Sequence, residues 1–104
     1  MTVIATSTTW IVPPGKDLEF IEMNSRAKKI HMRLGAENAV LGRIQIGENT
    51  GQYVYQLYFA SAATYGKFMD SVGTDKEWIA MYAEGVKKQV ATLGMSRLLV
   101  GIEI

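Results

Sequence analysis

Apolar and polar residues recur with two different periods along the chain, and the changes between the periods mark the elements that we expect. Residues 2–12 are rich in β-branched side chains and end at two prolines, which predicts a strand that stops there, because proline has no N–H to give to a sheet. From residue 17 to residue 34 the period becomes helical, and Gly35 follows as a plausible stop. The apolar face of this helix consists of Phe20, Met23, Ala27, Ile30 and Leu34.

A pair of strands and a second helical segment come next. Residues 39–46 and 52–60 are typical of strands on either side of a loop, residues 47–51, that begins and ends with glycine. Ser61 is a suitable N-cap for a helix that begins directly after it. The helical pattern is interrupted at residues 71–73, so we expect the helix to break there.

The interrupted helix restarts at a capping box. Thr74 and Glu77 have the spacing at which each side chain satisfies a free N–H of the other's backbone. We expect this helix to end at Gly94, with an apolar stripe made of Ile79, Ala83, Val86, Val90 and Leu93. Gly85 costs the helix up to about 1 kcal/mol relative to alanine, which suggests a close packing contact at that position. Residues 97–104 form the last predicted strand.

The order strand, helix, strand, strand, helix, strand predicts one α+β domain over residues 1–104. We expect the ferredoxin-like βαββαβ fold, a four-stranded antiparallel sheet with its helices on one face. The other face should be polar if water covers it, but Val3, Ala5 and Ile11 of the first strand and much of the last strand are apolar there. A second copy of the chain would bury that face, so we expect a homodimer.

Composition limits the partners that the chain can have. Its 104 residues are 48% hydrophobic and have a formal net charge of +1 with scattered basic residues, so we expect no nucleic-acid partner, which would need a concentrated basic stripe. The absence of cysteine excludes disulfides and cysteine-based metal sites. We find no signal-peptide pattern and no apolar run long enough to span a membrane, and therefore expect a cytoplasmic protein with no membrane partner.

Three segments together resemble a known superfamily. They are residues 12–16, where the first strand ends in Val-Pro-Pro-Gly-Lys, residues 53–59 after a glycine-bearing turn, and residues 74–78, where a helix starts. Their layout is similar to that of the dimeric α+β barrel superfamily, most of all to NIPSNAP-like proteins and more distantly to antibiotic-biosynthesis-type monooxygenases. The resemblance implies a homodimer in which two sheets close a barrel, often with a small cavity inside the barrel or between each sheet and its helices.

The resemblance implies less about activity than about fold. The superfamily includes cofactor-free oxygenases, haem-degrading enzymes, isomerases, dehalogenating enzymes and proteins with no known reaction. Many monooxygenase-like and haem-degrading members place a histidine in the second helix shortly after the third strand, where this chain has Tyr65, Gly66, Lys67 and Phe68. We therefore expect no cofactor, and a haem-binding protein is the third hypothesis that we carry.

His31 is the only histidine of the chain and is suited to acid–base chemistry near neutral pH. It lies at helical spacing from Ala27 and Leu34, at the edge of the apolar stripe, with Asn24 on the same side of the helix. His31 and Asn24 are thus candidate catalytic residues facing a cavity beneath the helix. The alternative is a boundary histidine with one nitrogen hydrogen-bonded and the other in solvent. A lone histidine does not make a metal site, so we expect none.

Arg43, Gln45, Gln56 and Tyr58 form a second candidate group, for ligand binding. If the two hairpin strands pair so that their apolar faces agree, all four side chains lie on the face away from the helices. There Arg43 could hold a carboxylate or enolate ligand through two hydrogen bonds. The alternative is that Arg43 pairs with Glu103 or with a carboxylate of the partner chain.

Trp10 completes the candidate ligand-binding residues. It belongs to an aromatic set that would suit a flat ligand but that could equally be core and interface: Trp10, Tyr53, Tyr55, Tyr58, Trp78 and Tyr82. Two hypotheses on function follow. In the first, a homodimeric barrel protein binds a small apolar or aromatic ligand or acts through its surface. In the second, the chain is a cofactor-independent monooxygenase or isomerase that uses His31 as acid and base.

Overall fold

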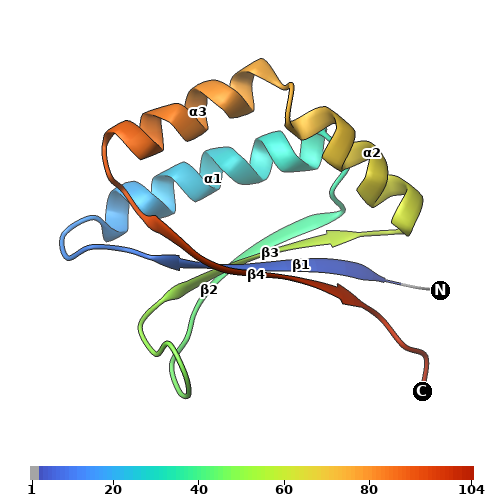
Figure 1. Cartoon of the computed structure of the whole chain (residues 1–104), viewed down its shortest axis with the longest axis horizontal. Coiled ribbons are helices and arrows are strands. Elements are labelled where there is room, and N and C mark those ends of the chain that lie inside the picture. Colours follow the sequence, from blue (N-terminus) through green and yellow to red (C-terminus); the bar gives the residue numbers. More distant parts are fainter. Residues whose placement is uncertain (1–2) are drawn as a thin grey trace.

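Two layers make up the structure, a computed structural model that describes residues 3–104 (Figure 1). A four-stranded antiparallel sheet forms one layer, and the helices lie together on one of its faces. The elements are β1 (Ile4–Ile11), α1 (Asp17–Arg33), β2 (Asn38–Arg43), β3 (Tyr53–Phe59), α2 (Ala62–Val72), α3 (Lys76–Lys87) and β4 (Thr92–Val100). The ferredoxin-like α+β fold is thus confirmed. Thr2, which we placed in the first strand, lies outside the described residues.

The strands are ordered β2-β3-β1-β4, so β2 and β4 form the edges of the sheet. Ile4 in β1 lies opposite Phe59 in β3 and opposite Val100 in β4. The pairing of β1 with β4 shifts its register between Thr8 and Trp10. Gly94 lies at this irregularity, and a Cβ there would come within 3.0 Å of a backbone oxygen of β1. A larger residue at position 94 would therefore push the two strands apart.

The covered face of the sheet carries the core of the domain. Alternate residues of β3 are buried and the residues between them are half-buried, as expected for a strand with one covered face. The buried residues are Tyr53, Tyr55, Leu57 and Phe59. Phe59 has no accessible surface, and its ring centroid lies 4.9 Å from that of Phe68 in α2. This aromatic packing fixes α2 against the sheet.

The structure corrects the facing that we expected for the second strand. Ala39 lies opposite Leu57 and is buried, whereas Val40 lies opposite Gln56 and is exposed. The predicted position of Arg43 on the face away from the helices implied that Val40, three residues earlier in the strand, faces the helices. Because side chains alternate along a strand, a shift of one residue exchanges its two faces, and the short side chains of β2 give a weak signal of which face is covered. The strand also ends at Arg43 rather than at residue 46.

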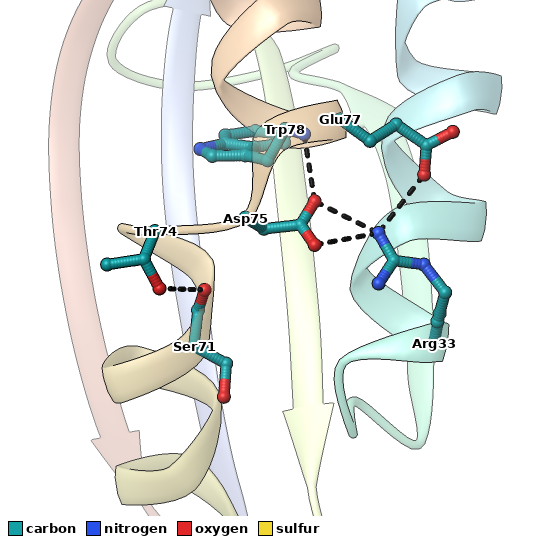
Figure 2. A network of polar contacts seen from close by, with 6 residues as sticks. All are labelled: Arg33, Ser71, Thr74, Asp75, Glu77 and Trp78. Carbon is teal, nitrogen blue, oxygen red and sulfur yellow. Dashed lines mark hydrogen bonds and ion pairs between the residues drawn. The ribbon is translucent and has the colours of Figure 1, made fainter.

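The helical region after β3 is divided as predicted, but its second cap is a different residue. Ser61 caps α2 by accepting a hydrogen bond from the backbone N–H of Thr64, which confirms the predicted N-cap. At the start of α3 the cap is Asp75, which accepts from the backbone N–H of Trp78, instead of the predicted Thr74 (Figure 2). Thr74 donates its hydroxyl proton to the carbonyl of Ser71. A carboxylate is a strong cap, because it faces the positive end of the helix dipole.

The expected bounds of the last helix and strand are wrong. Helix α3 ends at Lys87, and Gln89 has a left-handed φ of 52°, which an α-helix cannot continue. Val90 is therefore buried in a connection, and Leu93 belongs to β4, not to a helical stripe. The strand runs over Thr92–Val100 rather than residues 97–104.

The face of the sheet away from the helices is called here the open face. Among residues 3–104, no helix or strand packs on it (Figure 1). Strand β4 is exposed along its whole length, including large apolar side chains on both of its faces. These are Leu93, Met95, Leu98, Leu99 and Val100. In residues 3–104 no helix is long and apolar enough to cross a membrane.

Candidate functional site

A cavity of about 310 Å³ lies between α1, α3 and the covered face of the sheet. Helix α1 contributes Phe20, Met23, Asn24, Ala27 and His31. Helix α3 and the connection after it contribute Trp78, Met81, Tyr82, Gly85, Val86, Val90 and Ala91, and the sheet contributes Trp10, Tyr55, Thr92 and Leu93. The exposed members, such as Val86 and Leu93, mark the rim of the cavity. Apart from His31, Asn24, Thr92 and the tyrosines, its walls are apolar.

His31 forms the polar centre of this cavity. The residue is 4% exposed, and its Nδ1 shares a hydrogen bond of 2.7 Å with the hydroxyl of Tyr55. Three aromatic rings surround the imidazole, with centroids at 5.5 Å for Tyr55, 5.4 Å for Phe68 and 4.4 Å for Trp78. The alternative of a histidine at the solvent boundary does not fit this burial.

The second ring nitrogen of His31 is not fully buried. Within residues 3–104 every fully buried side-chain nitrogen or oxygen has a hydrogen-bond partner. Only Nδ1 of His31 is hydrogen-bonded there, so Nε2 must keep some accessible surface. Since His31 is otherwise buried and lines the cavity, we infer that this surface lies toward the cavity.

Burial also sets the protonation states of the pair. Desolvation lowers the pKa of His31 to about 4, because the charged imidazolium is costly away from water. For the same reason burial raises the pKa of Tyr55 far above its usual range. Both groups are thus neutral at pH 7, and the pair can offer a hydrogen-bond donor or a free basic nitrogen without carrying charge.

Asn24 and Trp10 line the same cavity as His31, which the helical spacing predicted for Asn24. The amide nitrogen of Asn24 donates to the carbonyl of Phe20 at 2.8 Å, which leaves its side-chain oxygen as an acceptor. Trp10 extends from β1, and its ring centroid lies 6.3 Å from that of Phe20. The structure thus brings together three of the seven candidate residues, and their roles stay predictions.

The other four candidates lie outside this cavity and do not share one face. Arg43 lies opposite Tyr53 on the covered side, where its guanidinium carbon is 5.4 Å from the tyrosine ring and its Nε donates to the carbonyl of Gly51. Gln56 and Tyr58 lie on the open face, where the tyrosine hydroxyl donates to the glutamine oxygen at 3.2 Å. The prediction that these residues share one face of the sheet is therefore wrong, because β2 turns Arg43 to the covered face and not to the open face.

Gln45 lies beyond the end of β2, where its side chain donates to the carbonyl of Arg43 at 3.5 Å. It is exposed. The sequence alternation had extended the strand through this residue, so its displacement has the same origin as the facing error. A ligand-binding role for Gln45 stays a prediction.

Tyr55 is the partner of His31 in the cavity that sequence reasoning did not single out. It belonged to the aromatic set, but nothing in the sequence linked it to His31, 24 residues away. The alternation of β3 gives a partial signal, since it places Tyr55 on the same face as Tyr53 and Leu57.

Among the described residues, no group of three or more His, Cys, Asp or Glu side chains could hold a metal ion.

No protein-family model matches the chain, and no curated protein matches its sequence. Solved structures do match. SnoaB, a cofactor-independent oxygenase from Streptomyces nogalater, superposes with a TM-score of 0.71 at 11% identity, over 100% of this chain and 97% of that one. A NIPSNAP family protein from Agrobacterium tumefaciens gives 0.70 at 14% identity, over 98% and 86%.

A third similar structure is a protein described as an antibiotic-biosynthesis monooxygenase from Bordetella bronchiseptica, with a TM-score of 0.66 at 17% identity over 100% of this chain and 99% of that one. At these identities the likeness concerns the fold. The fold is the one found in NIPSNAP and monooxygenase-like proteins, so the resemblance is confirmed as one of fold.

Proposed function

We propose that the protein binds a small neutral, apolar or aromatic molecule in the cavity between α1, α3 and the sheet. The observation that carries this proposal is a cavity of about 310 Å³ whose lining holds no Asp, Glu, Lys or Arg and whose one ionisable base, His31, has a pKa of about 4. An uncharged, mostly apolar lining with a few convergent polar groups is typical of small-molecule sites.

The polar groups restrict the ligand further. His31 Nε2 and the side-chain oxygen of Asn24 project from the same helix, and Trp10 offers a flat aromatic wall. A ring system with one hydroxyl or carbonyl group could stack on the aromatic side chains and hydrogen-bond to His31. A charged ligand would find no counter-ion among the lining residues, and its desolvation would oppose binding.

Binding of 1-naphthol, followed by its fluorescence, tests the proposal. Val86 lies at the rim of the cavity and is 62% exposed, so Val86→Trp adds bulk at the mouth without disturbing the core. We expect this variant to weaken binding by about tenfold, equivalent to about 1.4 kcal/mol. Ile79→Trp is the matched control, because Ile79 lies on the same helix, is 49% exposed and does not line the cavity. Equal binding by both variants would contradict the site.

A second candidate function is cofactor-independent oxygenation or isomerisation with His31 as acid and base. It is favoured by the neutral imidazole whose Nδ1 is held by Tyr55 while Nε2 faces the cavity. When Nδ1 carries the proton and donates to the phenol oxygen, Nε2 is a free base that can take a proton from a bound substrate. SnoaB, which shares the fold, is described as a cofactor-independent oxygenase.

Oxygen uptake with 1,8-dihydroxyanthrone, which has an acidic C–H group, tests this second function. We expect His31→Phe to lower the rate by about 100-fold, the lower end of what a general base contributes. Tyr55→Phe keeps the aromatic ring but removes the hydrogen bond to Nδ1 of His31. If this variant lowers the reaction rate by a larger factor than it weakens 1-naphthol binding, Tyr55 acts by orienting the base rather than by binding the ligand. An unchanged rate in His31→Phe contradicts acid–base catalysis and leaves the binding proposal intact.

The same fold supports a homodimer, which we propose forms through the open face. Along β1 and β4 this face carries Ala5 opposite Leu99 and Ser7 opposite Arg97, and β3 adds Tyr58. Leu99 is 53% exposed in the single chain. Exposed apolar surface of this extent on a small domain is typical of an interface, and an antiparallel sheet face can pack on its own copy about a two-fold axis. Sedimentation velocity at micromolar concentration tests the dimer.

A further inference from the structure

An ion pair and a helix cap meet at the start of α3, close to Trp78 (Figure 2). Trp78 is one of the residues that line the cavity. Arg33 is the last residue of α1, and a single nitrogen of its guanidinium, Nη2, contacts three carboxylate oxygens. The distances from Nη2 are 3.0 Å and 2.9 Å to the two oxygens of Asp75 and 3.1 Å to Glu77 Oε1. Asp75 is the more buried of the two partners, with 14% of its side chain exposed.

Asp75 connects this ion pair to the cavity. The carboxylate oxygen that lies 2.9 Å from Arg33 also accepts a hydrogen bond of 2.9 Å from the backbone N–H of Trp78. Asp75 is therefore both the N-cap of α3 and the anchor that ties its first turn to the end of α1. Any movement of Asp75 moves the backbone from which the Trp78 side chain projects.

Trp78 in turn closes the cavity over His31. The two ring centroids are 4.4 Å apart, nearer than any other ring to the imidazole, and both residues line the cavity. His31 and Arg33 belong to the same final turn of α1, one directed inward to the cavity and the other outward to Asp75. The end of α1 thus carries both the polar centre of the site and the fixing point of its wall.

Trp78 packs against the core, but the backbone that leads into α3 is weakly held. The junction after α2 is exposed at Gly73 and Thr74, and its backbone hydrogen bonds are long, 3.3 Å from Thr74 N to Ser71 O and 3.3 Å from Asp75 N to Val72 O. Farther along the helix, α3 is joined to α1 by a separate ion pair. The contacts of Asp75 and the packing of Trp78 therefore hold the first turn together.

We propose that Arg33 and Asp75 are positioning residues for the cavity: their ion pair fixes the first turn of α3, and with it the Trp78 ring that covers His31. The inference rests on the proposed function in so far as the cavity is the binding site. Loss of the ion pair lets the first turn of α3 move and admits water to the imidazole. The cavity then loses the wall that would hold a flat ligand against His31.

The titration of His31 in the free protein tests this inference, because the only histidine of the chain gives a single imidazole signal in NMR. In the native protein we expect a pKa of about 4. Hydration of the ring should raise that pKa by about one unit in both Arg33→Gln and Asp75→Asn. Asparagine is itself a good N-cap, so Asp75→Asn removes the charge and keeps the cap.

These two variants separate water entry from a direct effect of charge. Among the described residues, the ionisable groups that we consider around His31 are the hydroxyls of Tyr55 and Tyr82, the guanidinium of Arg33 and the carboxylates of Asp75 and Glu77. A purely electrostatic effect would raise the pKa of His31 when the positive Arg33 is removed and lower it when the negative Asp75 is removed. Movement of Trp78 predicts a rise in both, and a fall or no change in Asp75→Asn overturns the proposal.

Arg26→Gln is the matched control. Arg26 joins α1 to Glu84 of α3 through an N···O contact of 3.1 Å, but Glu84 does not cap the helix. We expect no change in the titration of His31 in this variant. Arg33→Lys keeps the charge and should restore a pKa between those of the native protein and Arg33→Gln. A variant that unfolds is recognised by the loss of its far-UV circular dichroism signal. If Arg33→Gln unfolds, the titration of His31 in Asp75→Asn, which keeps the helix cap, decides between the outcomes.

Binding of 1-naphthol gives the second measurement. We expect Arg33→Gln and Asp75→Asn to weaken it by about threefold, corresponding to loss of part of one ring contact. If the native protein fails to bind 1-naphthol, the proposed function fails while the His31 titration still decides the role of the ion pair. If binding occurs and the titration is unchanged in both variants, the positioning role fails and the binding site stands.

Discussion

The two faces of the sheet are built from the same strands but have different environments. On the covered face, β3 buries four residues in a row of alternate positions, and the hydroxyls of Tyr53 and Tyr55 have partners at 2.7 Å, Asp17 and His31. On the open face, the intervening residues of β3 are half-buried and β4 is exposed throughout. Polar groups are thus fixed by the helices on one side and left adaptable on the other.

This difference separates two kinds of function within one small domain. A neutral buried base needs rigid aromatic neighbours and exclusion of water, which only the helix-covered face offers to His31. An interface needs accessible apolar area, which the open face offers. The cavity and the proposed dimer surface therefore lie on opposite sides of the sheet, and mutations on one face should leave the other unaffected.

Truncation of neighbouring aromatic residues in β3 should give the largest difference between the faces. Phe59→Ala removes a ring with no accessible surface and should lower the free energy of unfolding by about 3–5 kcal/mol. Tyr58→Ala, one residue away on the half-buried open face, should cost less than half as much. Urea denaturation at low protein concentration measures both. Equal losses would mean that the open face is as well packed within one chain as the covered face.

The pH dependence of stability should come from the covered face. Because the pKa of His31 is about 4 in the folded state and about 6.5 when unfolded, the unfolded chain binds more protons between these values. The free energy of unfolding is therefore unaffected by His31 above pH 6.5, where the imidazole is neutral in both states. It falls as the pH is lowered from 6.5 to 4, by about 3 kcal/mol in total. Urea denaturation between pH 7 and pH 4 measures the slope, and His31→Phe should flatten it.

Carboxylates provide the internal control for this pH dependence. Hydrogen bonds from the backbone of Trp78 and from Arg33 lower the pKa of Asp75, and those from Lys88 and Arg26 lower the pKa of Glu84. Groups with lowered acidic pKa values lose their contribution only as the pH falls below their ordinary values, about 4. A slope that persists between pH 6.5 and pH 5 in His31→Phe would show that His31 is not its source.

Adjacent leucines of β4 should separate the faces in association. Leu99 lies opposite Ala5 on the open face, and Leu98 lies opposite Thr6 on the side of the helices. They are 53% and 51% exposed, so neither substitution to aspartate should unfold the single chain. We expect Leu99→Asp to raise the dimer dissociation constant by about 100-fold and Leu98→Asp to have a smaller effect. Sedimentation equilibrium compares them, and the reverse order would place the interface on the other side of β4.

The parts of this architecture that local sequence encodes could be predicted. The 17-residue helix α1 has three-to-four spacing of apolar residues, acidic residues in its first turn and basic ones in its last, so its existence and both ends follow from the chain itself. The alternation of β3 is similarly strong. His31 and Asn24 could be placed beneath α1 from helical spacing alone, and both line the cavity.

The parts that depend on distant residues could not be predicted. The contact between His31 and Tyr55 joins residues 24 apart, and the contact between Arg33 and Asp75 joins residues 42 apart, so no local period reveals either. The facing of β2 is set by its pairing with β3, and its small apolar residues allow both choices. Helix α3 ends before the predicted residue because Gln89 adopts a left-handed conformation. Glutamine is not typical of that conformation, so the sequence does not indicate the helix end.

Two helical glycines should show the smallest effect and the finest test of the covered side. A Cβ at Gly85 would lie 2.9 Å from Cε of Met23, which lines the cavity, whereas a Cβ at Gly66 in α2 would meet nothing within 4 Å. Gly66→Ala should therefore stabilise the protein by up to about 1 kcal/mol through helix propensity. In Gly85→Ala the same gain is offset by displacement of the flexible Met23 side chain, so we expect a net change within about 0.5 kcal/mol.

The cavity distinguishes these two substitutions more clearly than stability does. The new methyl group should displace the end of the Met23 side chain, which lines the cavity. The displaced side chain should then occupy part of the volume that a ligand needs. We expect Gly85→Ala to weaken 1-naphthol binding by about threefold and Gly66→Ala to leave it unchanged, a difference of about 0.7 kcal/mol. A gain of stability in Gly85→Ala as large as in Gly66→Ala, with unchanged binding, would mean that Met23 turns away from the cavity and that α1 and α3 are less closely packed than the structure shows.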